Sequence, residues 1–300
     1  MITLNKIKKT YNKGKLIAVR DISFEVKDGE IFGLIGPDGA GKTTIFRILT
    51  TLLLADEGSA VVHDLDVVKD YRKIRNIVGY MPGRFSLYQD LTVEENLNFF
   101  ATVFGTTIQE NYDLIKDIYQ QIEPFKTRRA GKLSGGMKQK LALCCALIHK
   151  PEVLFLDEPT TGVDVVSRKE FWEMLKRLKA QGITILVSTP YMDEANLCDR
   201  IALIQKGEIL SIDTPAQIVR SFPKKLFAMK SANSFELLND VRAYPETESC
   251  FAFGDSLHVT FTDHAETNIL DYLHSKGHHD ASIEEIEPEI EDCFIHLLKD

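Results

Sequence analysis

The stretch GLIGPDGAGKTT, residues 33–44, most constrains what this chain can fold into. It contains the spacing G-x-x-x-x-G-K-T between Gly36 and Thr43, the pattern of a phosphate-binding P-loop. The hydrophobic run EIFGLI before it predicts a buried parallel strand, and TTIFRILTTLL after it has apolar residues at helical spacing. Because strand, glycine loop and helix follow in the order that a P-loop requires, a chance glycine turn is the weaker interpretation.

The residue types of this loop suit a polyphosphate. Three glycines let the backbone turn its N–H groups toward a phosphate, and the following helix N-terminus adds favourable dipole charge. We expect Lys42 to reach the β- and γ-phosphates and Thr43 to coordinate Mg²⁺. The predicted nucleotide-binding residues are Gly36, Pro37, Asp38, Gly39, Ala40, Gly41, Lys42, Thr43 and Thr44.

A second run, EVLFLDEPTTGVD (152–164), predicts another buried strand that ends in two carboxylates. Asp157 is placed to hold Mg²⁺ through its water shell, so that Thr43 and Asp157 form the predicted metal site. Glu158 can polarise an attacking water as the general base. The alternative is a strand end whose acids only cap the next helix. The P-loop elsewhere in the chain favours the catalytic interpretation.

A third run, KLSGGMKQKLALCCALI (132–148), predicts a helix with a glycine-rich start. Ser134 can cap this helix, while Gly135 and Gly136 expose backbone N–H groups at its first turn. Leu141 and Cys144 then begin one apolar face. Taken alone, this pattern is better explained by a plain N-cap.

The distribution of charge predicts a domain boundary near SFPKK (221–225). Residues 1–223 carry 30 basic and 28 acidic side chains, whereas residues 224–300 carry 6 and 16, for formal charges of +2 and −10. Neither part has the basic stripe of a nucleic-acid-binding protein, so we expect no nucleic-acid partner.

The rest of the composition favours a cytoplasmic globular protein. No apolar run approaches the roughly 18 residues that a membrane helix needs, and the N-terminus MITLNKIKKTYNKG does not have the pattern of a signal peptide. The five cysteines form no CxxC pair, and we expect them to be reduced, buried thiols. Any role at a membrane therefore requires a separate partner.

Taken together, these motifs resemble the ATP-binding subunits of ABC transporters over residues 1–220. LSGGMKQK is similar to the family's signature, which implies that Ser134, Gly135 and Gly136 complete the ATP site of a second subunit. Asp164 matches the D-loop aspartate at the dimer interface. Tyr11 matches the aromatic residue that stacks on adenine, an interaction worth roughly 1–3 kcal/mol on nucleobases elsewhere. The alternative for Tyr11 is an ordinary tyrosine at a strand edge.

The resemblance implies an α/β fold: a P-loop NTPase of ABC type with a RecA-like core and an N-terminal antiparallel sheet. A helical signature subdomain is expected at about residues 84–150 within a domain covering 1–222. Residues 223–300 predict a small, acidic, ferredoxin-like α+β domain. This second domain resembles the C-terminal extension of drug-exporter and ABC-2-type ATPases. Its expected strands are 225–231, 249–255, 257–262 and 281–288, and its expected helices are 235–241, 265–277 and 290–299.

Two positions depart from the family pattern. Pro190, in VSTPYMDEA, stands where the family has a switch histidine that touches the γ-phosphate. Gly83, in VGYMPGRFSLYQD, stands where the family usually has a glutamine that contacts Mg²⁺ and the attacking water. Gln89 lies nearby, but at a place that in the family faces the membrane subunit. Because neither Gly83 nor Pro190 carries a polar side chain, we expect ATP to bind but to be hydrolysed slowly.

This combination is similar to the degenerate first ATPase half of tandem exporter ATPases. It implies an ATPase subunit of an exporter, with ATP and Mg²⁺ as ligands, associated peripherally with the inner face of the cell membrane through permease subunits. The implied partner is a second, motif-complete ABC ATPase subunit, with a homodimer ranked second. The alternative function is a soluble ABC ATPase or regulator that takes no part in transport.

Overall fold

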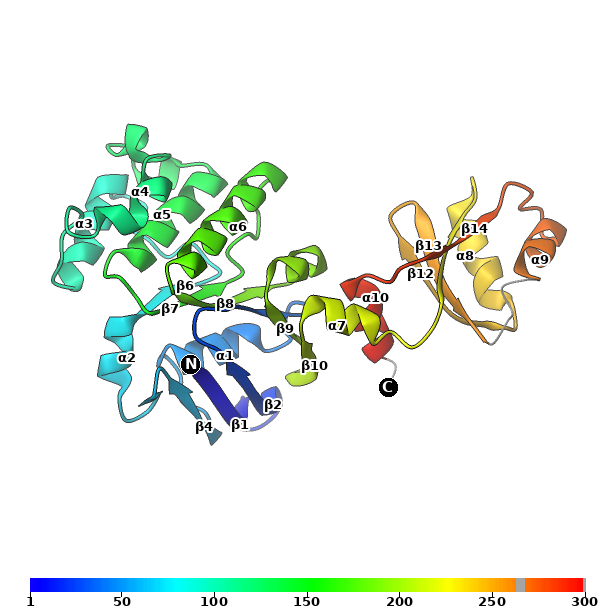
Figure 1. The fold of residues 1–300 in the computed structure, drawn as a ribbon, viewed down its shortest axis with the longest axis horizontal. Coiled ribbons are helices and arrows are strands. Elements are labelled where there is room, and N and C mark those ends of the chain that lie inside the picture. The colour runs from blue at the N-terminus through cyan, green and yellow to red at the C-terminus, as the bar shows by residue number, and fades with distance from the viewer. Residues whose placement is uncertain (263–267, 299–300) are drawn as a thin grey trace. The chain divides into compact units, whose positions relative to one another are not determined.

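A computed structural model describes residues 1–262 and 268–298, and the chain divides into two compact units, Met1–Pro215 and Ala216–Asp300 (Figure 1). The division follows the first residue of helix α7 (Pro215–Arg220) and lies a few residues before the expected boundary between residues 222 and 223. Contacts with the last helix, α10 (Ile290–Leu297), explain the difference. The Cys293 thiol donates a hydrogen bond to the Ile218 carbonyl (3.5 Å), and the rings of Phe222 and His296 lie 5.4 Å apart. The charge shift therefore begins later than the change of unit.

The first unit is built on a six-stranded sheet with strand order β10-β9-β3-β8-β7-β6. Strands β9, β3, β8, β7 and β6 run parallel, and β10 pairs antiparallel with β9 at one edge. All residues of β3, β7 and β8 are buried, because both faces of these apolar runs are covered. The bounds are β3 Ile31–Ile35, β6 Val78–Met81, β7 Val153–Asp157, β8 Thr184–Thr189, β9 Arg200–Gln205 and β10 Glu208–Asp213.

A second, antiparallel sheet is formed mostly by the N-terminal residues, with strand order β2-β1-β4-β5. Its inward-facing residues share one hydrophobic core with helix α1, the helix that follows β3. The stacked rings of Phe24 and Phe32, 5.3 Å apart, join the two sheets within this core. The bounds are β1 Ile2–Tyr11, β2 Leu16–Val26, β4 Glu57–Val62, β5 Leu65–Asp66 and α1 Lys42–Leu49.

Helices occupy the chain between β6 and β7, and Figure 1 shows them gathered at the end of this unit away from the antiparallel sheet. The first of them starts with a capping box, in which Thr92 and Glu95 satisfy each other's backbone N–H groups. The bounds here are α3 Val93–Val103, α4 Tyr112–Tyr119, the 3₁₀ turns η1 Glu123–Phe125 and η2 Ala130–Lys132, and α5 Gly135–Leu147. Elsewhere in the unit lie α2 Tyr71–Ile77, α6 Val165–Ala180 and the 3₁₀ segment η3 Met192–Leu197.

The second unit has a four-stranded antiparallel sheet, with strand order β12-β13-β11-β14, and its described residues add the helices α8 and α9 to α7 and α10. Residues 226–286 follow the strand–helix–strand–strand–helix–strand order of a ferredoxin-like unit. The helix expected at 265–277 is observed at Ile269–Ser275, and residues 263–267 and 299–300 lie outside the described part of the chain. The bounds are β11 Leu226–Lys230, α8 Ser234–Ala243, β12 Thr247–Phe253, β13 Ser256–Phe261, α9 Ile269–Ser275 and β14 Ser282–Ile286.

The five cysteines are all buried and free. Burial raises the pKa of the Cys250 and Cys293 thiols to about 11, so both stay protonated at neutral pH. In the described residues, no helix is both long enough and apolar enough to span a membrane.

Candidate active site

The predicted site residues meet at the carboxyl edge of β3, β7 and β8. In the parallel register, Ile35 of β3 lies beside Thr189 of β8, and Ser188 of β8 lies beside Asp157 of β7. The P-loop, the two carboxylates and the turn at Pro190 therefore all leave the sheet at one edge, where open α/β sheets bind their ligands. The Gly36 N–H donates to the Thr189 carbonyl (3.3 Å), which joins the P-loop directly to the end of β8.

The Lys42 ammonium group lies at the centre of this edge and is only 3% exposed. Its Nζ atom donates to the carbonyl oxygens of Gly36 (2.7 Å) and Pro37 (3.0 Å), and it forms an ion pair with Glu158 Oε1 (3.0 Å). The ammonium group is thus fully partnered by the loop and by the carboxylate that follows β7. An anionic ligand in this loop would exchange these partners for its own oxygens.

Two glycines of the loop are required by close backbone approaches. A Cβ atom at Gly36 would lie 2.1 Å from the Ile204 carbonyl oxygen, and one at Gly41 would lie 2.4 Å from that of Ala18. Gly41 also has a φ of +107°, a conformation that side chains disfavour. By contrast, Gly39 has a φ of +78° and free space around its Cβ position. Backbone conformation rather than crowding therefore explains the glycine at this position.

A serine that the sequence argument did not single out holds the Asp157 carboxylate and the Glu158 backbone N–H. Ser188 Oγ donates to Asp157 Oδ1 (2.7 Å) and accepts from the Glu158 N–H (3.0 Å). Asp157 is 2% exposed, whereas Glu158 is half-buried and has a left-handed φ of +52°. The detectable signal for Ser188 was the polar pair Ser-Thr that ends the otherwise apolar run ITILV.

The oxygen donors at this edge fit a magnesium ion. Thr43 is the second residue of α1, half-buried beside the P-loop, and Asp157 supplies a carboxylate. Mg²⁺ favours one or two protein oxygens, completed by phosphate and water. Across residues 1–262 and 268–298, no three or more His, Cys, Asp or Glu side chains group together as a metal cage. The donor set therefore suits a hard cation shared with a phosphate ligand.

Both unusual positions lie on this same edge. A Cβ atom at Gly83 would lie 3.0 Å from the Asp157 carbonyl oxygen and 3.8 Å from the Glu158 Cβ atom. Pro190 directly follows β8, and the turn after it is closed by a hydrogen bond from the Tyr191 N–H to Thr189 Oγ1 (3.1 Å). Neither position presents a polar side chain to the carboxylates.

Gln89, the nearest glutamine in sequence to the Gly83 position, lies elsewhere. Its carbonyl oxygen accepts from the Gly131 N–H (2.9 Å), at the 3₁₀ turn that precedes α5. A Cβ atom at Gly131 would lie 3.4 Å from the Gln89 Cβ atom. Gln89 is thus part of the helical segment, in contact with the turn before Ser134.

The predicted signature and D-loop residues meet each other. Ser134 caps α5 by accepting from the Met137 N–H (3.3 Å), and a Cβ atom at Gly136 would lie 2.8 Å from Ser167 Oγ. Asp164 caps α6 by accepting from the Ser167 N–H (3.0 Å), and this bond lowers the pKa of the Asp164 carboxyl. Similarly, a Cβ atom at Gly135 would lie 3.4 Å from the carbonyl oxygen of residue 162. The starts of α5 and α6 therefore form one continuous surface.

Tyr11 lies at the end of β1, the strand whose neighbour β2 packs over the P-loop helix. Its hydroxyl group lies 3.4 Å from Thr44 Oγ1, at the first turn of α1. The half-buried ring is thus fixed beside the nucleotide-binding segment. The stacking of Tyr11 on a base stays a prediction.

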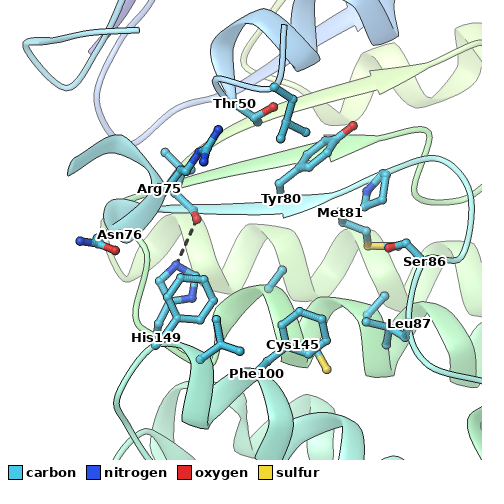
Figure 2. Close-up of a pocket in the computed structure, with 17 residues that line it drawn as sticks. Thr50, Arg75, Asn76, Tyr80, Met81, Ser86, Leu87, Phe100, Cys145 and His149 are labelled. Atoms are coloured by element: carbon cyan, nitrogen blue, oxygen red, sulfur yellow. Dashed lines mark hydrogen bonds between the residues drawn. The ribbon is translucent and has the colours of Figure 1, made fainter. Parts of the chain in front are cut away.

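A groove of about 490 Å³ runs between the sheet and the helical segment, within the same unit. Figure 2 shows Tyr80 and Met81 of β6 on one side and Phe100 and Cys145 of the helices on the other. Burial, with a smaller contribution from Asp157, raises the pKa of Tyr80 to about 12. The groove is mostly apolar, and the sequence argument missed it because its lining comes from five separate segments. Besides the four named above, its lining residues include Thr50, Leu52, Arg75, Asn76, Ser86, Leu87, Val103, Phe104 and His149.

Comparisons with known proteins agree with this arrangement. A family model described as "ABC transporter" matches residues 19–161. The probable multidrug ABC transporter ATP-binding protein YbhF of Escherichia coli (strain K12) is 39% identical over 303 residues, covering 99% of this chain and 52% of that protein. The chain thus spans about half the length of that relative.

Two further matches cover their counterparts almost completely. A solved structure of an ATP-binding subunit of an ABC transporter has a TM-score of 0.67 and 26% identity, covering 74% of this chain and 93% of its own. The Nod factor export ATP-binding protein I of Rhizobium sp. (strain N33) is 34% identical over 300 residues, covering 99% of this chain and 96% of that protein. On this coverage and this site geometry, the chain belongs to the ATP-binding proteins of the ABC transporter family.

Proposed function

We propose that this chain is the ATP-binding subunit of an exporter, which couples ATP binding and hydrolysis to movements of separate membrane subunits. Relatives with similar sequences along this chain carry names that refer to multidrug transport and to Nod factor export. ABC ATPases bind ATP, usually with Mg²⁺. The transport role, the partners and the rate of hydrolysis are the parts of this proposal that experiments must test.

One observation carries the proposal that the chain's own site is hydrolytically weak. The binding positions Lys42, Thr43 and Asp157 are all filled at the carboxyl edge, while Gly83 and Pro190 on the same edge supply no side-chain donor. Removing one preorganised transition-state donor typically costs about 10²–10³ in rate. Binding to the ground state depends on the positions that are filled, so we expect tight ATP binding with slow turnover.

In this proposal each residue has a separate task. The Lys42 ammonium group binds the terminal phosphates, and Tyr11 stacks on the base. Thr43 and Asp157 would hold Mg²⁺, which would supply positive charge to neutralise the phosphates. Glu158 accepts the proton of the attacking water, and for this it must leave its ion pair with Lys42, at 3.0 Å in this structure.

The surface that joins the starts of α5 and α6 supports a second ABC ATPase subunit as the partner. Val165 and Val166 follow Asp164 and are 79% and 69% exposed, so two apolar side chains stand in solvent at the start of α6. A motif-complete partner is favoured over a second copy of this chain, because a homodimer would contain two impaired sites. In the heterodimer, Ser134, Gly135 and Gly136 serve the partner's site.

The groove supports the membrane permease as a further partner, with peripheral attachment to the membrane as the consequence. Its lining is mostly apolar, and its rim carries the Arg75 guanidinium group, which is fixed by Thr51 Oγ1 (2.9 Å) and by the Thr51 carbonyl (3.0 Å). Such a surface suits a short amphipathic segment with an acidic end. Tyr80 and Met81 of the groove lie only a few residues before Gly83, so the two sites share one segment.

The decisive experiment is co-purification of the full chain with candidate permease and ATPase subunits, followed by measurement of ATP hydrolysis. We expect a stable complex and a rate that depends mainly on the catalytic glutamate of the partner ATPase. A chain that binds no membrane subunit and hydrolyses ATP unaided would contradict the transport role and favour a regulatory ABC ATPase instead.

A further inference from the structure

We propose that Glu194 is a positioning residue that holds the loop after Glu158 in its working conformation, acting through Thr160 and Arg168. The inference rests on the proposed role of Glu158 as general base. It concerns how a strained loop is fixed at the carboxyl edge of the sheet.

Glu158 needs such support because its backbone is strained. Its φ of +52° lies in the left-handed region, which is unfavourable for a residue with a side chain. A conformation of this kind persists only where the surrounding structure over-determines it. Before the loop, the Glu158 N–H is fixed by the carbonyl and hydroxyl oxygens of Ser188 (3.1 and 3.0 Å). What fixes the residues after Glu158 is a separate question.

Glu194 fixes the residues after Glu158 through a hydrogen bond with Thr160. Its carboxylate is 1% exposed, on the 3₁₀ segment η3. It accepts from Thr160 Oγ1 (2.8 Å) and from Thr189 Oγ1 (2.5 Å). Thr160 is two residues after Glu158, and Thr189 is the last residue of β8, next to the P-loop. One carboxylate therefore ties the catalytic loop to the strand end beside it.

Arg168 supplies the charge that lets this carboxylate remain buried. Its Nε atom (3.1 Å) and one terminal nitrogen (3.0 Å) both reach Glu194 Oε1. The guanidinium group also pairs with Asp193 (3.2 Å) and lies over the Tyr191 ring, 4.3 Å from its centroid. A buried carboxylate without such partners would be strongly unfavourable, so the pair has little freedom to rearrange.

The position of Arg168 extends the connection to the D-loop. Arg168 lies in the first turns of α6, whose N-cap is Asp164. The Glu194 carboxylate thus holds both ends of the segment 160–168, at Thr160 and at Arg168. We infer that the contacts of Glu194 with Thr160 and Arg168 fix Glu158 and Asp164 relative to the sheet. These contacts lie beside the turn at Pro190, which offers no side-chain donor.

A matched pair of substitutions separates positioning from simple stability. Thr160→Val keeps the shape of the buried side chain but removes its hydroxyl group, whereas Thr160→Ser keeps the hydroxyl group. Glu194→Gln weakens the charge pairing with Arg168. Glu30→Gln is the control, because Glu30 is also a buried glutamate paired with an arginine over an aromatic ring: Arg200 lies 3.2 Å from Glu30 and 5.3 Å from the Phe32 ring centroid.

The first readout is hydrogen–deuterium exchange of the amides of residues 158–163 in the full chain. Two of these amides, Thr161 and Val163, bond within the loop itself, to Glu158 and Thr160. We expect exchange to accelerate at least about tenfold in Thr160→Val and in Glu194→Gln, and to stay unchanged in Thr160→Ser and in Glu30→Gln. Equal exchange in Thr160→Val and Thr160→Ser would overturn the inference, even if Glu194→Gln proved unable to fold.

The second readout is the split between kcat and ATP affinity. We expect Thr160→Val to lower kcat at least about fivefold while the Kd for ATP changes less than twofold, because the phosphate loop is untouched. A Glu158-dependent rate that is equal in Thr160→Val and in the unmodified chain would also overturn the inference. If the unmodified chain shows no Glu158-dependent hydrolysis, the role proposed for Glu158 fails, and the exchange comparison still decides whether Glu194 holds the loop.

Discussion

Restoring the two missing side-chain donors should accelerate ATP hydrolysis by the isolated chain. The change is Pro190→His combined with Gly83→Gln, which places an imidazole and an amide at the carboxyl edge beside Glu158. Two lost donors at about 2.7–4 kcal/mol each would account for a slow site. We expect the double variant to recover about tenfold or more in kcat, since one factor of ten corresponds to about 1.4 kcal/mol.

The structure limits how much of the lost kcat the two substitutions can restore. A Cβ atom at Gly83 would lie 3.0 Å from the Asp157 carbonyl oxygen, so glutamine fits only after a shift of a few tenths of an ångström. Gly83 does not have a left-handed φ, so no further backbone strain opposes a side chain there. At position 190, replacing proline also releases the fixed φ of the turn, so the single Pro190→His change is expected to recover less than the pair.

The assay is steady-state ATP hydrolysis by the unmodified chain, both single variants and the double variant, with Glu158→Gln as the blank. Gly83→Ala and Pro190→Ala serve as controls, because they change the backbone and the volume without adding a donor. A fast rate in the unmodified chain that disappears in Glu158→Gln would refute the weak-site reasoning. Equal rates in the alanine and donor variants would show that conformation, not donation, limits this site.

Three further outcomes are expected. Lys42→Ala should weaken Mg-ATP binding at least about tenfold by calorimetry, because the ammonium group is the buried cation of the P-loop; an unchanged Kd would rule out this pocket. A chain truncated after Pro215 should fold and bind ATP with unchanged affinity, since the unit boundary lies there; loss of ATP binding by a folded truncated chain would contradict this division of labour. Burial lowers the pKa of His149, which stacks on the Phe104 ring at 3.8 Å, so its stabilising contribution is present above pH 6.5 and is lost as pH falls below that value. Accordingly, between pH 7 and pH 5.5 the melting temperature of His149→Phe should fall less than that of the unmodified chain. An equal fall in both proteins would refute the stabilising role assigned to neutral His149.

The sequence predicted the sheet and its loops well because their signals are local. The P-loop lies between a buried strand and a helix in one continuous stretch, and the run before Asp157 is apolar throughout. The same holds for the second unit, whose alternating strands and helices are each marked by their own residues. The unit boundary after Pro215 lies earlier in the chain than the charge shift, because α7 contacts α10 through backbone and thiol groups that carry no charge signal.

What the sequence could not predict depends on contacts between distant segments. Ser188 contacts the Asp157 carboxylate and the Glu158 backbone N–H, which lie 31 and 30 residues earlier in the chain, and Glu194 contacts Thr160 across 34 residues. Nothing in the local pattern of YMDEA distinguishes a buried, fully paired glutamate from an acidic first turn exposed to solvent. The groove escaped prediction for the same reason, because its apolar lining is assembled from strands and helices that are individually unremarkable.

The short stretch from Tyr80 to Gly83 joins the groove to the carboxyl edge of the sheet. Its first residues line the groove, and its last residue lies against the backbone that carries Asp157 and Glu158, about 10 Å further on at the rise of an extended chain. With a glutamine at position 83, a movement of this stretch would also move a side-chain amide beside the carboxylates. Because Gly83 has no side chain, a movement of the groove would reach Asp157 and Glu158 only through displacement of the main chain. In the transporter that we propose, such a stretch would relay motion to the partner's site while the chain's own site hydrolyses ATP slowly.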